Sequence, residues 1–315
     1  MKVAILVLDG VFDTGLAAFT DALATADALV PERRRKFDAM RVGLRRRVST
    51  AQGLSVPTER VPQQAPELAL VPTLGAKTEH DLAAALERPD VGDAAQLLKR
   101  WAAAGTRIGG ACTATFLLAT AGVLDRERAT TSWWLASAFR RRFPAVQLDE
   151  SRMIVEANRA VTAGAALAHL DLALWVVRKR SPSLARVTAR HLAFQRSPSQ
   201  AAYAMPDHLE HSDEVVERFE AWARAHLRSF SVAAAARAVG AGERTLERRV
   251  RHALRKSPIA FVQDLRVEEA VHQLETTERT IDEIAAAVGY ASGTTLGTLI
   301  RRKTGVGIRD LRARR

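Results

Sequence analysis

The chain repeats one short pattern near its C-terminal end, first over residues 231–254 and again over residues 280–305. Each copy opens with an alanine-rich stretch of helical spacing that ends in Val-Gly, with the glycine at Gly240 and at Gly289. Glycine adopts the left-handed backbone conformation without strain, so it can end one helix and turn the chain into the next. The repeated pattern therefore predicts two helix-turn-helix units.

The second helix of each copy carries basic side chains, and a helix in this position enters the major groove of DNA with its early residues facing base edges. One copy would fit any pair of packed helices, but two copies joined by a helical stretch over residues 259–275 favour DNA binding over an ordinary helical bundle. The basic residues expected on one face are Arg248, Arg249 and Arg251, then Arg301, Arg302 and Lys303. The residues expected to contact double-stranded promoter DNA are Arg244, Thr245, Glu247, Arg248 and Arg251, then Ser292, Thr294, Thr295, Thr298, Arg301 and Arg302.

The charge balance agrees with an anionic partner without proving one. The 315 residues carry a formal net charge of +12, which favours nucleic acid, but much of the basic excess precedes residue 212. The helical pattern therefore carries the prediction. With one cysteine, the chain has neither an intrachain disulfide nor a cysteine zinc cluster, and we expect no metal and no cofactor. The absence of a signal peptide and of a membrane-length apolar run predicts a cytoplasmic protein without a membrane partner.

The N-terminal two thirds of the chain alternates strands with helices. Continuous apolar runs at residues 3–8 and 67–71 are typical of parallel strands covered on both faces, and helical patterns follow them. We therefore predict an α/β fold, a mostly parallel flavodoxin-like sheet with helices on both faces. The predicted domains are residues 1–195, a linker over 196–212 that contains two prolines and no apolar period, and an all-α domain over 213–315.

Cys112 lies between a predicted strand over residues 106–111 and a helix over residues 113–121. This strand-turn-helix order is typical of a nucleophile elbow, in which the side chain stands at the carboxyl end of the strand. The following helix N-terminus would lower the pKa of the thiol. Three interpretations remain open: a residue lining a ligand pocket, a small core residue without a role, or a reactive thiol.

The C-terminal repeat resembles the AraC/XylS family of bacterial transcription regulators. The family's Ser-Pro followed by an apolar helix ending in Leu-Arg is present at 257–266, and its Ile-Ala followed by Val-Gly-Tyr is present at 284–290. Two positions depart from the family pattern: Leu296 replaces an aromatic residue, and Gly307-Ile308 replaces Ser-Pro. Neither change removes a basic residue.

The N-terminal domain resembles the class I glutamine-amidotransferase-like superfamily, in its PfpI/ThiJ group. The resemblance is carried by the Cys112 elbow, by residues 129–134 and by the later Ala163-Gly164 and residues 170–174. It implies that Asp21 supplies an acid beside the cysteine. Many relatives have histidine where this chain has Ser132, so the obvious base for a hydrolytic cysteine is missing. The residues expected to bind a ligand are Asp21, Cys112, Thr113, Ser132 and Trp133.

Together the two resemblances predict a sequence-specific regulator, not an enzyme, in which a small-molecule effector bound in the N-terminal domain controls DNA binding. The resemblance suggests an amino acid, a betaine or another nitrogen compound, which an aromatic ring such as Trp133 would hold through cation–π attraction. We also expect a homodimer, and a contact with RNA polymerase if the protein activates transcription. The alternatives are a cysteine-dependent amidase or hydrolase fused to a DNA-binding module, and a sequence-independent DNA binder.

Overall fold

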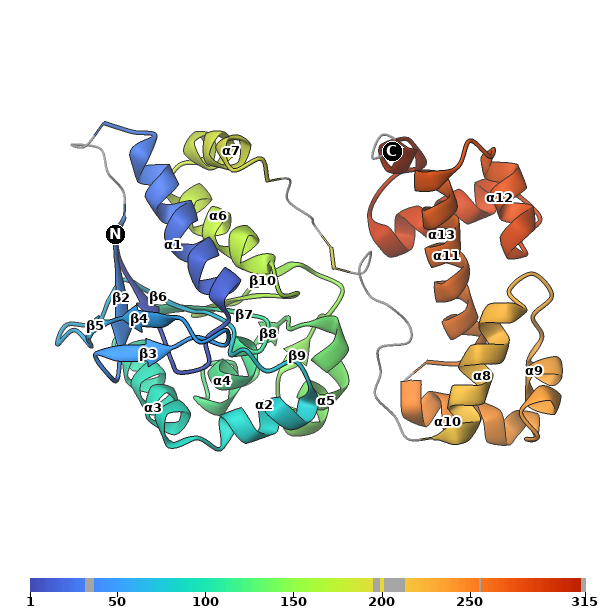
Figure 1. Cartoon of the computed structure of the whole chain (residues 1–315), viewed down its shortest axis with the longest axis horizontal. Coiled ribbons are helices and arrows are strands. Elements are labelled where there is room, and N and C mark those ends of the chain that lie inside the picture. The colour runs from blue at the N-terminus through green and yellow to red at the C-terminus, as the bar shows by residue number, and fades with distance from the viewer. Residues whose placement is uncertain (32–36, 195–198, 201–212, 255, 313–315) are drawn as a thin grey trace. The chain divides into compact units, whose positions relative to one another are not determined.

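The structure, a computed structural model, describes residues 1–31, 37–194, 199–200, 213–254 and 256–312. It divides into two compact units, Met1–Gln200, called here the α/β unit, and Ala201–Arg315, called the helical unit (Figure 1). The predicted linker over 196–212 falls largely outside the described residues; the two of its residues that are described, Ser199 and Gln200, belong to the α/β unit. In the described part of the chain, no helix is both long and apolar enough to cross a membrane.

The α/β unit is built on a seven-stranded sheet in the order β10-β11-β7-β6-β1-β2-β5. Every neighbouring pair is parallel except β10 and β11. The inner order β2-β1-β6-β7-β11 is that of flavodoxin-like folds, as the sequence predicts. The strands of this sheet are β1 (Lys2–Leu6), β2 (Asp38–Gly43), β5 (Glu59–Arg60), β6 (Leu68–Val71), β7 (Arg107–Ala111), β10 (Ile154–Glu156) and β11 (Ala160–Ala163).

Alternate residues of the first strand enter two separate cores, because successive side chains of a strand point to opposite faces. Val3 and Ile5 pack with the helices of one face, and Ala4 and Leu6 with those of the other. Figure 1 shows α1, α6 and α7 on one side of the sheet and α2 to α5 on the other. These helices are α1 (Asp13–Ala28), α2 (Glu79–Leu86), α3 (Pro89–Ala103), α4 (Ala114–Thr120), α5 (Ala136–Arg142), α6 (Ala168–Arg180) and α7 (Pro182–His191).

Two further segments of this unit lie outside the main sheet. Residues 47–57 form a hairpin of β3 (Arg47–Ser49) and β4 (Ser55–Pro57), because the chain turns at Gly53, whose φ is 84°. A 3₁₀ turn, η2 (Trp133–Leu135), comes directly before α5. A short parallel pair, β8 (Arg128–Ala129) with β9 (Gln147–Leu148), frames this segment.

The helical unit contains two hydrophobic cores that share one long helix. Phe261, Val262 and Leu265 of α11 pack in the first core, and Ala270 and Leu274 of the same helix pack in the second. Each core belongs to one helix-turn-helix unit. Figure 1 shows the two units at the two ends of α11. The helices are α8 (Glu214–Ala225), α9 (Val232–Ala238), α10 (Glu243–Leu254), α11 (Pro258–Thr276), α12 (Ile281–Val288), α13 (Gly293–Thr304) and α14 (Ile308–Arg312).

Candidate nucleic-acid interface and the buried cysteine

The first helix-turn-helix consists of α9 and α10. Ser231 caps α9 by accepting a hydrogen bond from the backbone N–H of Ala234 at 3.2 Å. Gly240 takes the left-handed conformation, with φ 70°, and ends the helix as the sequence predicts. Leu246 and Val250 of α10 are fully buried against α8 and α11, so the opposite face of α10 is left to solvent.

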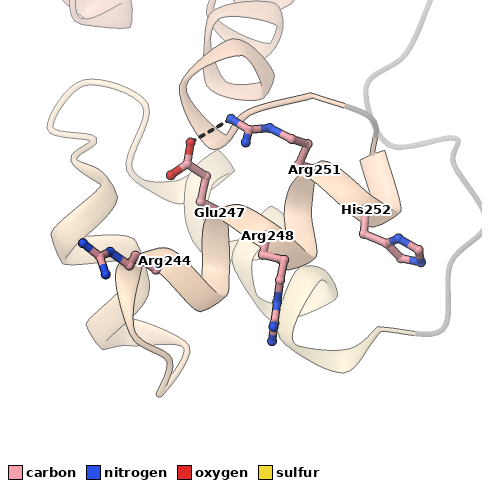
Figure 2. A pocket seen from close by; sticks show the side chains of 5 residues that line it. All are labelled: Arg244, Glu247, Arg248, Arg251 and His252. Atoms are coloured by element: carbon pink, nitrogen blue, oxygen red, sulfur yellow. Dashed lines mark hydrogen bonds and ion pairs between the residues drawn. The ribbon is translucent and has the colours of Figure 1, made fainter.

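Four long polar side chains project from that exposed face of α10 (Figure 2). Arg244, Glu247, Arg248 and Arg251 are exposed, and together with His252 they line a shallow concave surface with a volume of about 460 Å³. Glu247 and Arg251, one helical turn apart, form an ion pair at 2.9 Å. Three guanidinium groups on one helix face can donate in pairs to guanine or to phosphate oxygens.

The prediction that Arg249 shares this basic face is wrong. The Arg249 guanidinium forms an ion pair with the carboxylate of Asp213, at 3.1 Å, and Asp213 caps the N-terminus of α8. On a helix, residues 248 and 249 are about 100° apart. The Arg249 side chain is 44% exposed, but its guanidinium is paired with Asp213 and does not line the concave surface that Arg248 lines.

The second helix-turn-helix consists of α12 and α13. Thr280 and Glu283 form a capping box at the start of α12, and Gly289 ends that helix with φ 89°. A Cβ atom at Gly289 would lie 2.8 Å from the carbonyl oxygen of Arg228 and 2.9 Å from a nitrogen of Arg266. Glycine is therefore required here by both conformation and space.

The exposed face of α13 carries hydroxyl groups first and positive charge last. Ser292 caps the helix by accepting a hydrogen bond from the N–H of Thr294 at 3.1 Å. Leu296 is fully buried, in place of the aromatic residue that is usual in the family. The exposed residues of this helix that the sequence assigns to DNA are Thr294, Thr295, Thr298, Arg301 and Arg302.

A second concave surface, of about 430 Å³, runs beside α13. Its lining contains four of the predicted DNA contacts, and also Gln263 and Tyr290, which the sequence did not predict to contact DNA. The four are Thr294, Thr295, Thr298 and Arg302. Lys303, predicted to share the basic face, forms an ion pair with Asp264 of α11. This ion pair holds Lys303 against α11, so the prediction that Lys303 shares the exposed basic face is wrong. Asp264 also binds Lys256, at 2.7 Å.

One arginine fastens the two helix-turn-helix units together. The Arg266 side chain, on α11, donates two hydrogen bonds to the carbonyl oxygen of Leu227, at 3.0 and 2.6 Å. Its guanidinium carbon lies 5.3 Å from the ring centroid of Tyr290, at the turn of the second unit. The spacing of α10 and α13 is therefore set by α11 and by this arginine.

The α/β unit contains the predicted elbow at Cys112. The cysteine joins β7 to α4 with φ 56°, a left-handed conformation that is rare outside glycine. Its backbone N–H donates to the carbonyl oxygen of Ala163, at 2.8 Å, which ties the turn to β11. The strand-turn-helix layout expected from the sequence is present.

The environment of the thiol differs from the expectation. Cys112 is only 2% exposed, and burial raises the pKa of its thiol despite hydrogen bonds from Ser132, Thr73 and Thr113. The Ser132 hydroxyl donates to the sulfur at 2.7 Å. The predicted lowering of the thiol pKa by the helix N-terminus is therefore wrong, because loss of water outweighs the effect of the helix.

Asp21 does not lie beside the cysteine. Its side chain is exposed on α1, whereas Phe19 of the same helix points inward and meets His169 edge-on, with ring centroids 5.0 Å apart. Gly15, one turn earlier, also faces this histidine, since a Cβ atom there would lie 2.6 Å from its Nε2. The interpretation of Asp21 as the acid of the elbow is corrected, because the helix turns that residue toward solvent.

His169 and Asp171, both on α6, are buried. His169 Nε2 accepts from the backbone N–H of Thr73 at 3.1 Å, and Nδ1 lies 2.7 Å from the carbonyl oxygen of Ala166. This pairing favours the neutral tautomer with the proton on Nδ1. Burial lowers the pKa of His169 to about 4, so the ring is neutral near pH 7 and both its nitrogens are occupied.

In the described part of the chain, the side chains that form hydrogen bonds with the elbow carry hydroxyl groups. Thr131 donates to the carbonyl oxygen of Cys112 at 2.9 Å, and Thr113 donates to that of Leu74 at the same distance. Trp133, half-buried, follows Ser132 and meets Trp134 edge-on at 5.5 Å, while Trp134 packs on the core. The structure thus brings Cys112, Thr113, Ser132 and Trp133 into one neighbourhood and leaves Asp21 out of it.

Comparison with known proteins agrees with this division. Residues 235–314 match the family described as helix-turn-helix domain. The HTH-type transcriptional regulator GbdR of Pseudomonas aeruginosa is 23% identical over 316 residues, which cover 99% of this chain and 84% of that protein. Among solved structures, an AraC family transcriptional regulator from Pseudomonas putida has a TM-score of 0.51 and 22% identity, and covers 61% of this chain and 98% of its own. A ThiJ/PfpI family protein from Pseudomonas syringae has a TM-score of 0.50 and 20% identity, over 62% of this chain and 76% of its own.

Two helix-turn-helix units on a shared helix, joined to an α/β unit, define a DNA-binding transcriptional regulator. More narrowly, the chain is an AraC-type helix-turn-helix regulator, and its α/β unit has the fold seen in ThiJ/PfpI proteins.

Proposed function

We propose that the chain is a sequence-specific regulator in which a small metabolite bound to the α/β unit changes the way the helical unit binds DNA. The observation that carries the proposal is the chemistry around Cys112. The thiol is buried and its pKa is raised, and its nearest polar partners are neutral hydroxyl and amide groups. Such groups suit recognition of a ligand by hydrogen bonds, whereas a hydrolytic cysteine needs a base within hydrogen-bond reach.

We propose that α10 recognises bases mainly through Arg244, Thr245, Glu247 and Arg248, with Arg251 held by Glu247 near the DNA backbone. On α13, the base contacts would come from the hydroxyl groups of Ser292, Thr294, Thr295 and Thr298, and the phosphate contacts from Arg301 and Arg302. Because one rigid helix spaces the two units, their contacts fall on successive major-groove faces, about 10 base pairs apart. Homodimerisation would pair two such half-sites. An activator would in addition contact RNA polymerase.

We propose a small cationic or zwitterionic nitrogen compound as the effector, with Trp133 as its aromatic contact. Trp133 is half-buried and lies next to Ser132, which holds the thiol, so a ligand on its ring would also meet the elbow. A cation on an indole ring contributes about 0.5–2 kcal/mol. Trp133→Ala should therefore weaken the effector by about 2- to 30-fold.

Calorimetry with a panel of amino acids and betaines tests this assignment, followed by operator binding with and without the compound that gives heat. The expected result is one compound that binds the wild-type chain, binds Trp133→Ala more weakly, and changes operator affinity. A panel without any heat, or a compound that binds yet leaves DNA affinity and transcription unchanged, would contradict the proposal.

A further inference from the structure

Gln200 is fully buried although it is the last described residue before the helical unit. Its backbone N–H donates to the carbonyl oxygen of Ser151 at 3.1 Å, and the hydroxyl of Ser199 donates to the same oxygen at 2.7 Å. An antiparallel bridge pairs Ser199 with Arg152. The chain that leads to the helical unit is therefore bound to the loop before β10.

The side-chain amide of Gln200 is held by groups that match it atom by atom. Nε2 donates to the carbonyl oxygens of Thr131 at 2.8 Å and Arg152 at 3.3 Å, and lies 3.1 Å from the hydroxyl oxygen of Thr130. Oε1 accepts from the backbone N–H of Trp133 at 3.3 Å. We name this set of groups the amide pocket. Three acceptors for one nitrogen and one donor for the oxygen select a primary carboxamide.

Gly164 leaves the space that the amide fills. A Cβ atom on Gly164 would overlap both the nitrogen and the amide carbon of Gln200. The backbone N–H of Gly164 is itself bound to the carbonyl oxygen of Met153, at 2.9 Å, which keeps the strand ends of this region in place. Alanine at this position would therefore expel the Gln200 side chain from the pocket without changing Gln200 itself.

The amide pocket is continuous with the elbow. Thr131 accepts from Gln200 through its carbonyl oxygen and donates through its hydroxyl to the carbonyl oxygen of Cys112. Ser132, the next residue, donates to the sulfur, and Trp133 donates its N–H to Gln200. A ligand that moves residues 130–133 must therefore stretch or break the hydrogen bonds of Gln200.

We propose that Gln200 is an internal ligand of the amide pocket, and that its release, by a nitrogen compound of the class proposed above that also carries a primary carboxamide, transmits effector binding to the helical unit. Only residues 201–212 separate Gln200 from Asp213, which caps α8. When the amide leaves the pocket, Gln200 keeps only its backbone hydrogen bond to Ser151, so the attachment of the connecting chain to the α/β unit is weakened. This inference rests on the proposed control of DNA binding by the α/β unit.

Two variants of the full chain remove the anchor by different routes, each with a matched control. Gln200→Ala deletes the amide, and Gln147→Ala, an exposed glutamine on β9, is its control. Gly164→Ala fills the pocket, and Gly92→Ala, where a Cβ atom meets nothing within 4 Å, is its control. Hydrogen exchange at the amide of Trp133 should be at least about tenfold faster in both anchor variants than in their controls. Operator affinity should change by at least about fivefold, the lower end of ordinary coupling between sites.

Acetamide corresponds to the fragment that Gln200→Ala removes. It can fill the pocket without attaching the chain to it, so it distinguishes the effect of occupancy from the effect of anchoring. It should raise the Tm of Gln200→Ala by about 2 °C and slow exchange at Trp133, while leaving Gly164→Ala, whose pocket is filled by the new methyl group, unchanged. N,N-dimethylacetamide, which lacks N–H groups, should have no effect. Because acetamide does not reattach the chain, the altered operator affinity should persist.

The proposal would be overturned if hydrogen exchange at the Trp133 amide were equally slow in the anchor variants and in their controls. It would also be overturned if the operator affinity of the anchor variants stayed within twofold of the controls. Recovery of operator affinity by acetamide would also overturn it, since anchoring would then be irrelevant. A wild-type chain that ignores every metabolite, while both anchor variants bind DNA differently, would refute effector control and leave the anchor standing.

Discussion

The two units hold their polar side chains in opposite ways. In the α/β unit, hydroxyl groups, the thiol of Cys112 and the imidazole of His169 are buried, neutral and bonded to the backbone. In the helical unit, the polar side chains on the outer faces of α10 and α13 are exposed, and many are charged. Buried neutral groups specify geometry, whereas exposed charges supply attraction that salt weakens. The difference supports the proposal that the α/β unit recognises a small molecule and the helical unit a polyanion.

The largest expected difference between the two units is in their stability to acid, because His169 is buried in the α/β unit. Its folded-state pKa, about 4, lies below the ordinary value of 6.5, so the unfolded chain binds a proton that the folded unit excludes. Stability is therefore complete above pH 6.5 and falls as the pH drops from 6.5 toward 4, by about 3 kcal/mol. Urea unfolding of the full chain at pH 7 and pH 4.5, monitored by hydrogen exchange at the amides of the α/β unit, measures this loss of stability.

His169→Asn is the control for this prediction. The variant lowers stability at every pH, but its stability should change much less between pH 7 and pH 4.5 than that of the wild type. The same slope in both proteins would mean that other groups, such as the carboxylates of Glu67 and Glu156, cause the acid sensitivity.

Charge on α10 should give the next largest effect. Arg248→Ala should weaken operator binding by about 1–3 kcal/mol if the guanidinium reads a guanine. Arg249→Ala is the neighbouring control: its side chain is paired with Asp213, so we expect operator affinity to stay within about twofold and stability to fall by less than about 1 kcal/mol. Gel-shift titration of both variants checks the pair. Equal losses of affinity would place Arg249 on the DNA as well.

Removing a positive charge at the end of α13 should change the salt dependence of DNA binding without changing its sequence specificity. Arg302→Ala should reduce the slope of log K against log salt concentration by about 0.9, the value for one phosphate contact. Lys303→Ala should leave the slope unchanged, because that ammonium is paired with Asp264. Fluorescence anisotropy at several salt concentrations measures both slopes, and a smaller slope in the lysine variant would show that its ion pair opens on DNA.

The smallest expected effect is that of removing the sulfur. Cys112→Ser should leave operator affinity within about twofold, because the thiol is buried, its pKa is raised, and it lies in the other unit. Assays of amide hydrolysis with the wild type test the enzymatic alternative directly. If the wild type hydrolyses an amide and the serine variant does not, that result would contradict the proposal that the α/β unit recognises a ligand without catalysing a reaction.

Much of the fold could be predicted because apolar spacing and glycine positions are local signals. The run around Val3 and Ile5 identified an inner strand of the sheet, and Gly240 and Gly289 marked both turns. Faces were harder to predict. Asp21 was assigned to the cysteine, and Arg249 and Lys303 to the basic faces of their helices, but a rotation of one residue on a helix changes the groups that a side chain meets.

The chemistry of the elbow could not be read from the sequence because it depends on burial. The helix after Cys112 predicts a lowered thiol pKa, and only the tertiary packing shows that loss of water dominates. Gln200 gave no local signal, since it lies in a stretch without apolar period. Its one trace was the Ala163-Gly164 pair, where the glycine leaves room for the amide.

The central claim is that α10 and α13 contact consecutive turns of one duplex. Footprinting of the full chain on operators selected from genomic fragments tests it most directly, with Arg248→Ala and Thr295→Ala compared with the wild type. The account predicts two protected base clusters per half-site, about 10 base pairs apart, of which the first variant weakens one and the second variant the other. A single cluster, or a footprint that both variants weaken uniformly, would contradict it.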